Sequence, residues 1–300
     1  MKERMHKYVQ ETDRWHNRAI SPLSFTSKAD AQKPTIMVHP GWGKRPEILK
    51  YLLFELAEAG TRPIGVDTRF GYSDKFNHSG YTFNSKTGGR TTTQKYRVGT
   101  ENPFFDVSSA DDNKYRLRRP TGLVALMLEL DIDEASMFGH SEGGRVVSTV
   151  AAESKIPLSV PKLVVANSVG VGETQGIEGQ LKSNTSNNEL FDSENLKTLS
   201  EAVPSALLST IYAATHPRRW WREKAVIESA DIWENLQICS VQNGTEVTVI
   251  HAIADHVIDY ASSAAKAEQY PNIAFVSTEG SHSNVYTQAF RDVVVPLLAA

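Results

Sequence analysis

The sequence predicts an α/β protein with a largely parallel, doubly wound sheet, and two observations support this prediction. Short apolar runs of strand length alternate along the chain with segments of helical periodicity, which is the order found when strand–helix units build a parallel sheet. Several of these runs are apolar throughout rather than at every second position, as expected of strands that are buried on both faces.

The first strand–helix unit is the most regular one. The run "PTIMVHP" at 34–40 predicts a buried strand that ends in turn residues. In the segment 46–60, apolar side chains recur at helical spacing, Pro46 suits the first turn, and Gly60 ends the helix. The next strand is predicted at "RPIGVD", residues 62–67.

Later units repeat this order. The run "EASMFG" at 134–139 predicts a strand, and "GGRVVSTVAAE" predicts the helix that follows it. Three further strands are expected within "PKLVVANSVGV", "TEVTVIHAIAD" and "NIAFVSTEG", and an amphipathic helix, "SNVYTQAFRDVVVPLLA", closes the chain.

Two segments interrupt the alternation. Residues 74–113 are polar and rich in turn residues, and the runs on either side of "KTGG" predict a small hairpin. Residues 172–236 pass from a Gly/Asn/Ser-rich linker into a helical pattern. Both segments follow the carboxyl end of a predicted strand, the edge at which open α/β sheets bind ligands. We therefore expect 74–113 to form a lid-like insertion and 172–236 a helical cap on a core made of 1–171 and 237–300.

Composition narrows the class of protein. The 300 residues are 22% charged and 40% hydrophobic with a net charge of −3, which is ordinary for a globular protein and gives no general attraction to nucleic acid or membrane. Basic clusters at 114–119 and 216–224 have acidic neighbours and are expected to be solvated helix faces. The first residues contain no apolar core of signal-peptide length, and no later stretch has the length of a membrane span. The only cysteine, Cys239, cannot form an internal disulfide, so we expect a cytoplasmic protein.

The motif "GHSEGG" identifies Ser141 as a candidate nucleophile. Gly139 and Gly143 flank the serine at the spacing G-x-S-x-G, with an apolar run before it and a helical pattern after it. A sharp strand-to-helix turn of this kind exposes the serine hydroxyl at the edge of the sheet. The alternative is that Ser141 is only a small residue in a glycine-rich turn.

A serine nucleophile needs a base and an acid that orients the base. His282, in the loop after a predicted late strand, can reach the same sheet edge as Ser141. Asp255 follows the strand before it, whereas Asp259 is expected inside the next helix. The other customary place for the acid holds Asn167 and no carboxylate.

An oxyanion requires two fixed backbone N–H donors. The first expected donor is the amide of Glu142, at the start of the helix after Ser141. The second is expected in the turn "HPGWG", where Pro40 has no N–H and Trp42 is preferred over Gly41. For the Glu142 side chain, we prefer the role of a helix-start carboxylate that is stabilised by the helix dipole to that of a carboxylate that reaches the lid and holds it shut.

Five motifs occur in an order that resembles the α/β-hydrolase superfamily over nearly the whole chain. They are "VHPGWG", similar to the oxyanion turn; "GVDTRFGYS"; "GHSEGG", similar to the nucleophile elbow; "VIHAIADHVI", similar to the acid motif; and "GSH", similar to the closing histidine loop. The resemblance implies an α/β-hydrolase fold, a triad of Ser141, Asp255 and His282, and Trp42 and Glu142 as oxyanion donors. Ala252 and Phe70 replace glycines that are usual in two of the motifs.

The sequence therefore predicts a carboxylesterase-type serine hydrolase that needs neither metal nor cofactor and acts on a small molecule with an apolar acyl group. Trp220 and Trp221 in the cap and Phe76 in the lid are candidate substrate contacts. Lactone, thioester, amide or carbon–carbon bond cleavage and perhydrolysis would use the same fold. A ligand-binding or signalling protein on a hydrolase scaffold is the alternative of another class. The substrate and the oligomeric state stay open.

Overall fold

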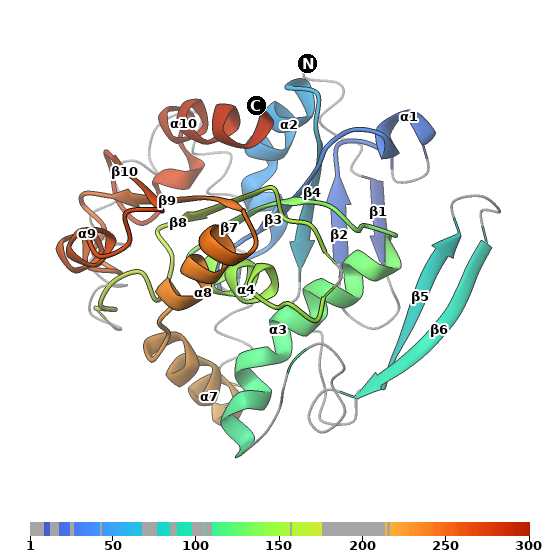
Figure 1. Cartoon of the computed structure of the whole chain (residues 1–300), viewed down its shortest axis with the longest axis horizontal. Coiled ribbons are helices and arrows are strands. Elements are labelled where there is room, and N and C mark those ends of the chain that lie inside the picture. The colour runs from blue at the N-terminus through green and yellow to red at the C-terminus, as the bar shows by residue number, and fades with distance from the viewer. Residues whose placement is uncertain are drawn as a thin grey trace.

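The computed structural model describes residues 9–12, 18–24, 27–42, 44–67, 77–84, 89–97, 105, 110–156, 158–175, 214 and 217–300. An eight-stranded sheet runs through this part of the chain, with helices above and below it (Figure 1). In sheet order the strands are β1 (Val9–Thr12), β2 (Arg18–Ser21), β4 (Arg62–Asp67), β3 (Thr35–His39), β7 (Ser136–His140), β8 (Lys162–Ala166), β9 (Glu246–Ala252) and β10 (Ala274–Thr278).

Within this sheet, β4, β3, β7, β8, β9 and β10 are all parallel to one another, and β2 runs antiparallel to both of its neighbours, β1 and β4. The predicted doubly wound, mostly parallel sheet is thus confirmed, and each strand expected from an apolar run is present. Because β7, β8, β9 and β10 are adjacent and parallel, their carboxyl ends meet at one edge of the sheet.

Two layers of helix cover the sheet. Helices α2 (Lys50–Glu58) and α10 (Gln288–Ala299) lie on one face, and α3 (Ala110–Glu129), α4 (Glu142–Ala151) and α8 (Trp233–Gln237) lie on the other (Figure 1). Strand β3 serves both layers, since Ile36 and Val38 belong to the hydrophobic cluster of the first face and Met37 to that of the second. This alternation explains why the whole run is apolar.

The described residues form several further helical elements. They are α1 (Lys28–Ala31), α7 (Pro217–Glu228) and α9 (Tyr260–Ala267), the 3₁₀ helices η2 (Pro46–Leu49) and η5 (Asn284–Tyr286), and the single π-helical turn η4 (Ile238–Gln242). Pro46 opens η2 directly before α2, and Gly60 follows α2 with a φ of +89°, as the sequence predicted. Asp259 caps the start of α9 by accepting from the Ser262 amide, so it is not inside that helix.

The two predicted insertions are described only in part. Strands β5 (Asn77–Asn84) and β6 (Gly89–Arg97) pair antiparallel, which confirms the hairpin expected around "KTGG". Most other residues of 74–113, and 176–213 of the predicted cap, lie outside the described residues, so the domain division stays a prediction. In the part of the chain that the structure describes, no helix has both the length and the apolarity to cross a membrane.

Candidate active site

Ser141 lies at the sharp turn between β7 and α4. Its backbone has a φ of 55° and a ψ of −123°, a conformation that is strained for a residue with a side chain. A β-carbon on Gly139 would lie 2.5 Å from the carbonyl carbon of Gly143, and one on Gly143 would lie 2.3 Å from the carbonyl oxygen of His39. Gly139 is therefore required for β7 to approach the start of α4, and Gly143 for that start to approach the end of β3.

The structure brings Ser141, His282 and Asp255 together in a continuous chain of hydrogen bonds. The distance between His282 Nε2 and Ser141 Oγ is 3.1 Å, and that between His282 Nδ1 and Asp255 Oδ2 is 2.8 Å. The three side chains follow β7, β10 and β9 respectively. Their convergence is a direct result of the strand order, because these strands end at the same edge of the sheet.

Asp255 is held in one orientation. Its Oδ1 accepts hydrogen bonds from the backbone amides of Val257 and Ile258 at 2.7 and 3.0 Å, and its Oδ2 lies 3.5 Å from His251 Nε2. Burial would raise the pKa of the Asp255 carboxyl, but the charge of His282 and the hydrogen bonds of His251 and His282 outweigh burial and bring this pKa well below its usual value. Asp255 is therefore an ionised acceptor at neutral pH.

Asn167, at the end of β8, fixes the loop that carries His282. Its Nδ2 donates to the carbonyl oxygen of His282 at 3.1 Å and to Asn284 Oδ1 at 2.9 Å, while its Oδ1 accepts from the amide of Ala252 at 2.8 Å. The backbone φ of Asn167 is +45°, a region that asparagine tolerates better than most residues. The side chain at the position considered for the acid thus supports the histidine loop instead.

His140 lies beneath the site as a neutral imidazole. It is buried, its ring lies 5.0 Å from that of His282, and its Nε2 donates to the His282 carbonyl oxygen at 3.1 Å. Burial first, and then the charge of His282, lower the pKa of His140 to about 3. His140 and Asn167 therefore hold the same carbonyl group, and no local sequence pattern predicts this contact for either residue.

The turn after β3 lies against the candidate nucleophile. A β-carbon on Gly41 would be 3.4 Å from Ser141 Oγ, so the backbone of this turn borders the space in front of the hydroxyl. Within the described part of the chain, the amides of Trp42 and Glu142 donate to no hydrogen-bond acceptor. Two unused N–H groups at this place are the feature that an oxyanion site requires.

Trp42 packs against α7. Its ring lies 5.4 Å from that of Trp220, which in turn lies 5.0 Å from Trp221, and its Nε1 donates to Glu223 Oε2 at 3.3 Å. Trp221 is 57% exposed, so one large aromatic surface of this row faces solvent. Phe76, the third candidate substrate contact, lies outside the described residues.

The Glu142 side chain lies in the first turn of α4, at the helix start where it was expected. It is buried there in an ion-pair network: Oε2 lies 2.5 Å from Arg119 Nη1, and Oε1 lies 3.1 Å from Arg145 Nη2. Arg118 and Arg119 both contact Glu223 of α7, at 3.2 and 3.5 Å. The prediction that the basic cluster 114–119 is a solvated face is therefore wrong for these two arginines, which are buried because carboxylates from α4 and α7 neutralise them.

Among the described residues, no group of three or more His, Cys, Asp and Glu side chains could hold a metal ion. The groups present at the sheet edge are a hydroxyl, an imidazole, a carboxylate and two unused backbone amides. Together they form the set that nucleophilic attack on a carbonyl group requires.

The structure is similar to several solved structures of other proteins. The structure is similar to a serine hydrolase from Cycloclasticus zankles (TM-score 0.55, 13% identity, 96% of each chain) and to a bromoperoxidase from Bacillus anthracis (TM-score 0.58, 15% identity, 98% of this chain and 100% of the other). It is also similar to the enol-lactonase from Burkholderia xenovorans LB400, with a TM-score of 0.56 and 16% identity over 98% of this chain and 96% of the other. No family model and no curated protein sequence matches the chain.

These similarities show that the protein has the α/β-hydrolase fold, as the resemblance of the sequence motifs implied. At such low identities the likeness concerns the fold, and any activity has to be argued from the residues of this chain.

Proposed function

We propose that the protein is a serine hydrolase that cleaves carboxylic esters of small molecules through an acyl-enzyme on Ser141. The observation that carries this proposal is the hydrogen-bond chain from Ser141 through His282 to Asp255, with distances of 3.1 and 2.8 Å. The fold does not require the side chains of a turn serine, a loop histidine and a buried aspartate to be hydrogen-bonded in this sequence, so the arrangement supports a catalytic role.

In the proposed reaction, Ser141 Oγ attacks the carbonyl carbon of the ester and gives its proton to His282 Nε2. Asp255 holds His282 Nδ1–H and stabilises the imidazolium that forms. The tetrahedral intermediate collapses, the C–O bond to the alcohol breaks, and His282 returns the proton to the leaving oxygen. Water then attacks the acyl-enzyme with His282 as base and releases the carboxylic acid and Ser141.

The negative charge of the tetrahedral intermediate is proposed to be bound by the amides of Trp42 and Glu142, with Gly41 as the other candidate in the first turn. Their lack of other acceptors in the described part of the chain supports this role, as does the closeness of Gly41 to Ser141 Oγ. Trp220 and Trp221 are proposed substrate contacts, because a row of aromatic rings connects them to Trp42.

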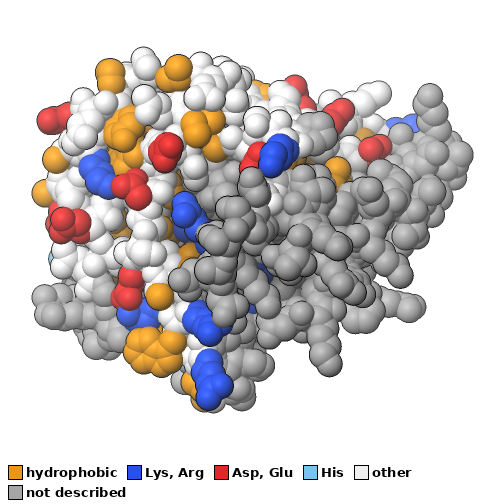
Figure 2. Space-filling view, turned by 60° about the horizontal axis from the view of Figure 1, so that its bottom comes forward, with side chains coloured by type: hydrophobic (Ala, Val, Ile, Leu, Met, Phe, Trp, Pro, Cys, Tyr) orange, Lys and Arg blue, Asp and Glu red, His pale blue; other side chains and the backbone are white. Residues whose placement is uncertain are grey.

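The substrate is proposed to be apolar rather than a polyanion. On the described part of the face seen in Figure 2, hydrophobic side chains lie among basic and acidic ones. A lactone is a cyclic ester that the same groups would open, and one neighbour in the comparisons is an enol-lactonase. Lactones therefore belong in the first substrate panel beside linear esters and thioesters.

The test is covalent labelling with a fluorophosphonate, read as intact mass and located by peptide mapping. We expect a single adduct on Ser141, none in Ser141→Ala, and labelling slowed about 1,000-fold or more in His282→Ala. His256→Ala is the matched control, because His256 is an exposed histidine next to Asp255 and should label at the wild-type rate. A folded wild-type protein that hydrolyses no ester and takes up no label would favour the ligand-binding alternative.

A further inference from the structure

The two residues proposed as oxyanion donors are connected through their side chains. Trp42 follows β3 and Glu142 begins α4, and neither amide donates to an acceptor within the described part of the chain. Both side chains contact a buried ion-pair network that contains Arg119 of α3 and Glu223 of α7. Two turns that are far apart in the sequence therefore share one set of contacts.

Glu223 anchors the Trp42 side chain. Its Oε2 accepts from Trp42 Nε1 at 3.3 Å, and the ring of Trp220, from the same helix, lies 5.4 Å from the ring of Trp42. Trp42 stands between Gly41 and Gly43 in the sequence, and glycine leaves the main chain more conformational freedom than any other residue. The contacts of the Trp42 side chain therefore restrict a turn that its own residues restrict little.

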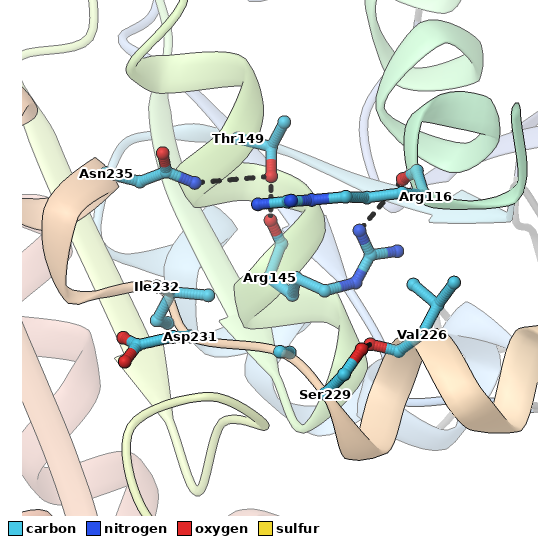
Figure 3. A pocket seen from close by; sticks show the side chains of 9 residues that line it. Arg116, Arg145, Thr149, Val226, Ser229, Asp231, Ile232 and Asn235 are labelled. Atoms are coloured by element: carbon cyan, nitrogen blue, oxygen red, sulfur yellow. Dashed lines mark hydrogen bonds between the residues drawn. The ribbon is translucent and has the colours of Figure 1, made fainter. Parts of the chain in front are cut away.

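Glu142 is held from two sides. Arg119 Nη1 lies 2.5 Å from its Oε2, and Arg145 Nη2 lies 3.1 Å from its Oε1. Arg145 is fixed in turn, because its Nη1 donates to the carbonyl oxygen of Arg116 in α3 at 2.9 Å, a contact drawn in Figure 3. The start of α4, and with it the strained turn at Ser141, is thereby tied to α3.

Arg119 and Glu223 join the two ends of this network. Glu223 Oε2, which accepts from Trp42 Nε1, also lies 3.5 Å from Arg119 Nη2, and Arg119 Nη1 pairs with Glu142. Glu223 Oε1 accepts from Arg118 Nη1 at 3.2 Å, so both oxygens of this carboxylate are occupied. The side chains of Arg119 and Glu223 are only 6% and 8% exposed. Charged hydrogen bonds are strong in such surroundings, and a change at one member of a network affects the others.

We propose that Arg119 and Glu223 are positioning residues of the active site. They fix the two amides, those of Trp42 and Glu142, relative to each other so that both can donate to one oxyanion. This inference rests on the proposed function, because an oxyanion forms only if Ser141 attacks a carbonyl group. Each donor must lie about 2.7–3.1 Å from the oxygen on which the charge develops, and a misplacement of about 1 Å can cost about 100-fold in rate.

The test compares the hydrolysis of para-nitrophenyl butyrate with that of its thiono analogue, in which sulfur replaces the carbonyl oxygen. Sulfur is a weak hydrogen-bond acceptor, so the amides of an oxyanion site favour the oxygen ester. Glu223→Gln replaces the carboxylate by an amide with a single acceptor oxygen, which cannot serve the indole of Trp42 and the two arginines together.

We expect Glu223→Gln to lower kcat/KM for the ester about tenfold or more and to lower that for the thionoester less, so that the ratio between the two narrows about threefold or more. A variant that merely contained less folded protein would lose both activities by the same factor and keep the wild-type ratio. The ratio therefore separates a positioning role from a structural one.

Two further variants make the result decisive. Trp42→Phe keeps an aromatic ring beside Trp220 and every ion pair, and it removes only the N–H group that Glu223 accepts, so it should narrow the ratio in the same direction. Glu55→Gln is the matched control, because it makes the same change opposite the buried Arg291 in the helical layer on the other face of the sheet, and it should keep the wild-type ratio.

An unchanged ratio in both Glu223→Gln and Trp42→Phe would overturn this inference, as would an equal narrowing in Glu55→Gln. A wild-type protein that hydrolyses neither compound and takes up no fluorophosphonate would overturn the proposed function, and the inference with it. That result is read from the wild type alone, so the two failures are distinguishable.

Discussion

Replacing Asn167 with alanine tests whether one side chain holds the histidine loop. The substitution removes three hydrogen bonds at once, those to the amide of Ala252, the carbonyl oxygen of His282 and the Oδ1 of Asn284. Ala252 is the last residue of β9, His282 lies in the loop after β10, and Asn284 begins η5, so the loss is concentrated where His282 is positioned.

The magnitude follows from what each partner loses. A buried polar group left without a partner costs about 1–3 kcal/mol, and the His282 carbonyl oxygen keeps its bond from His140. The φ of +45° at position 167 adds about 1 kcal/mol when alanine must adopt it. We expect Asn167→Ala to lower the free energy of unfolding by about 3–5 kcal/mol.

Urea unfolding followed by tryptophan fluorescence measures this loss, and the fluorophosphonate labelling rate of the folded variant measures the effect on the site. The matched control is Asn243→Ala, which removes a single bond, from Nδ2 to the Ala151 carbonyl oxygen at 2.9 Å. It should cost about 1 kcal/mol and leave labelling unchanged. If both variants lose equal stability and label equally fast, Asn167 does not position His282 and the reasoning is refuted.

Three other substitutions have distinct expected outcomes. Gly41→Ala places a β-carbon 3.0 Å from the Ser141 β-carbon. It should slow fluorophosphonate labelling about tenfold or more and lower the free energy of unfolding by about 1–3 kcal/mol. Unchanged labelling would show that this turn does not border the site. His140→Gln tests a pH effect. The pKa of His140 is lowered to about 3 in the folded protein, so the unfolded chain takes up this proton at a higher pH than the folded one does. The free energy of unfolding should therefore fall as the pH drops below about 6.5, by on the order of 4 kcal/mol at pH 3. The variant should show a flatter stability curve over that range in urea titrations, and an identical curve would contradict a neutral buried histidine. Glu142→Gln leaves Arg145 without a full ion pair and should cost about 3–5 kcal/mol in the same assay; a loss below about 1 kcal/mol would mean that the pair is not buried as described.

Local sequence patterns predicted the central sheet well, because its strands are apolar on both faces and are separated by regular helices. They missed β1 and β2, whose short runs "VQET" and "RAIS" are mixed in polarity and lie at the edge of the sheet. The hairpin was predictable from its turn residues, since the signal lies within the segment itself.

The candidate site was predictable to the extent that strand order decides it. Ser141, Asp255 and His282 each follow a strand of one parallel sheet, so their meeting at one edge could be inferred from the chain alone. The role of Asn167 could not, because its partners lie 85 to 117 positions away in the sequence. In the sequence, position 167 stands out only because it lacks a carboxylate, and no local pattern reveals which groups a side-chain amide will contact.

The same limit explains the error about the basic cluster 114–119. A run of arginines with acidic neighbours in the sequence resembles a solvated helix face. Arg118 and Arg119 are instead neutralised by the distant carboxylates of Glu223 and Glu142. Pairing over such separations depends on how helices pack, which periodicity does not contain.

Glu223 fastens α7 to α3 inside the protein, and this attachment limits how the molecule can open. Lifting α7 would leave Arg118 and Arg119 without the carboxylate they share, at a cost of about 3–5 kcal/mol. Fewer than about one molecule in a hundred would then be open at any moment, and a substrate that needed this opening would bind correspondingly more weakly. Because Trp220 and Trp221 belong to α7, the same ion pairs keep their rings in place beside Trp42.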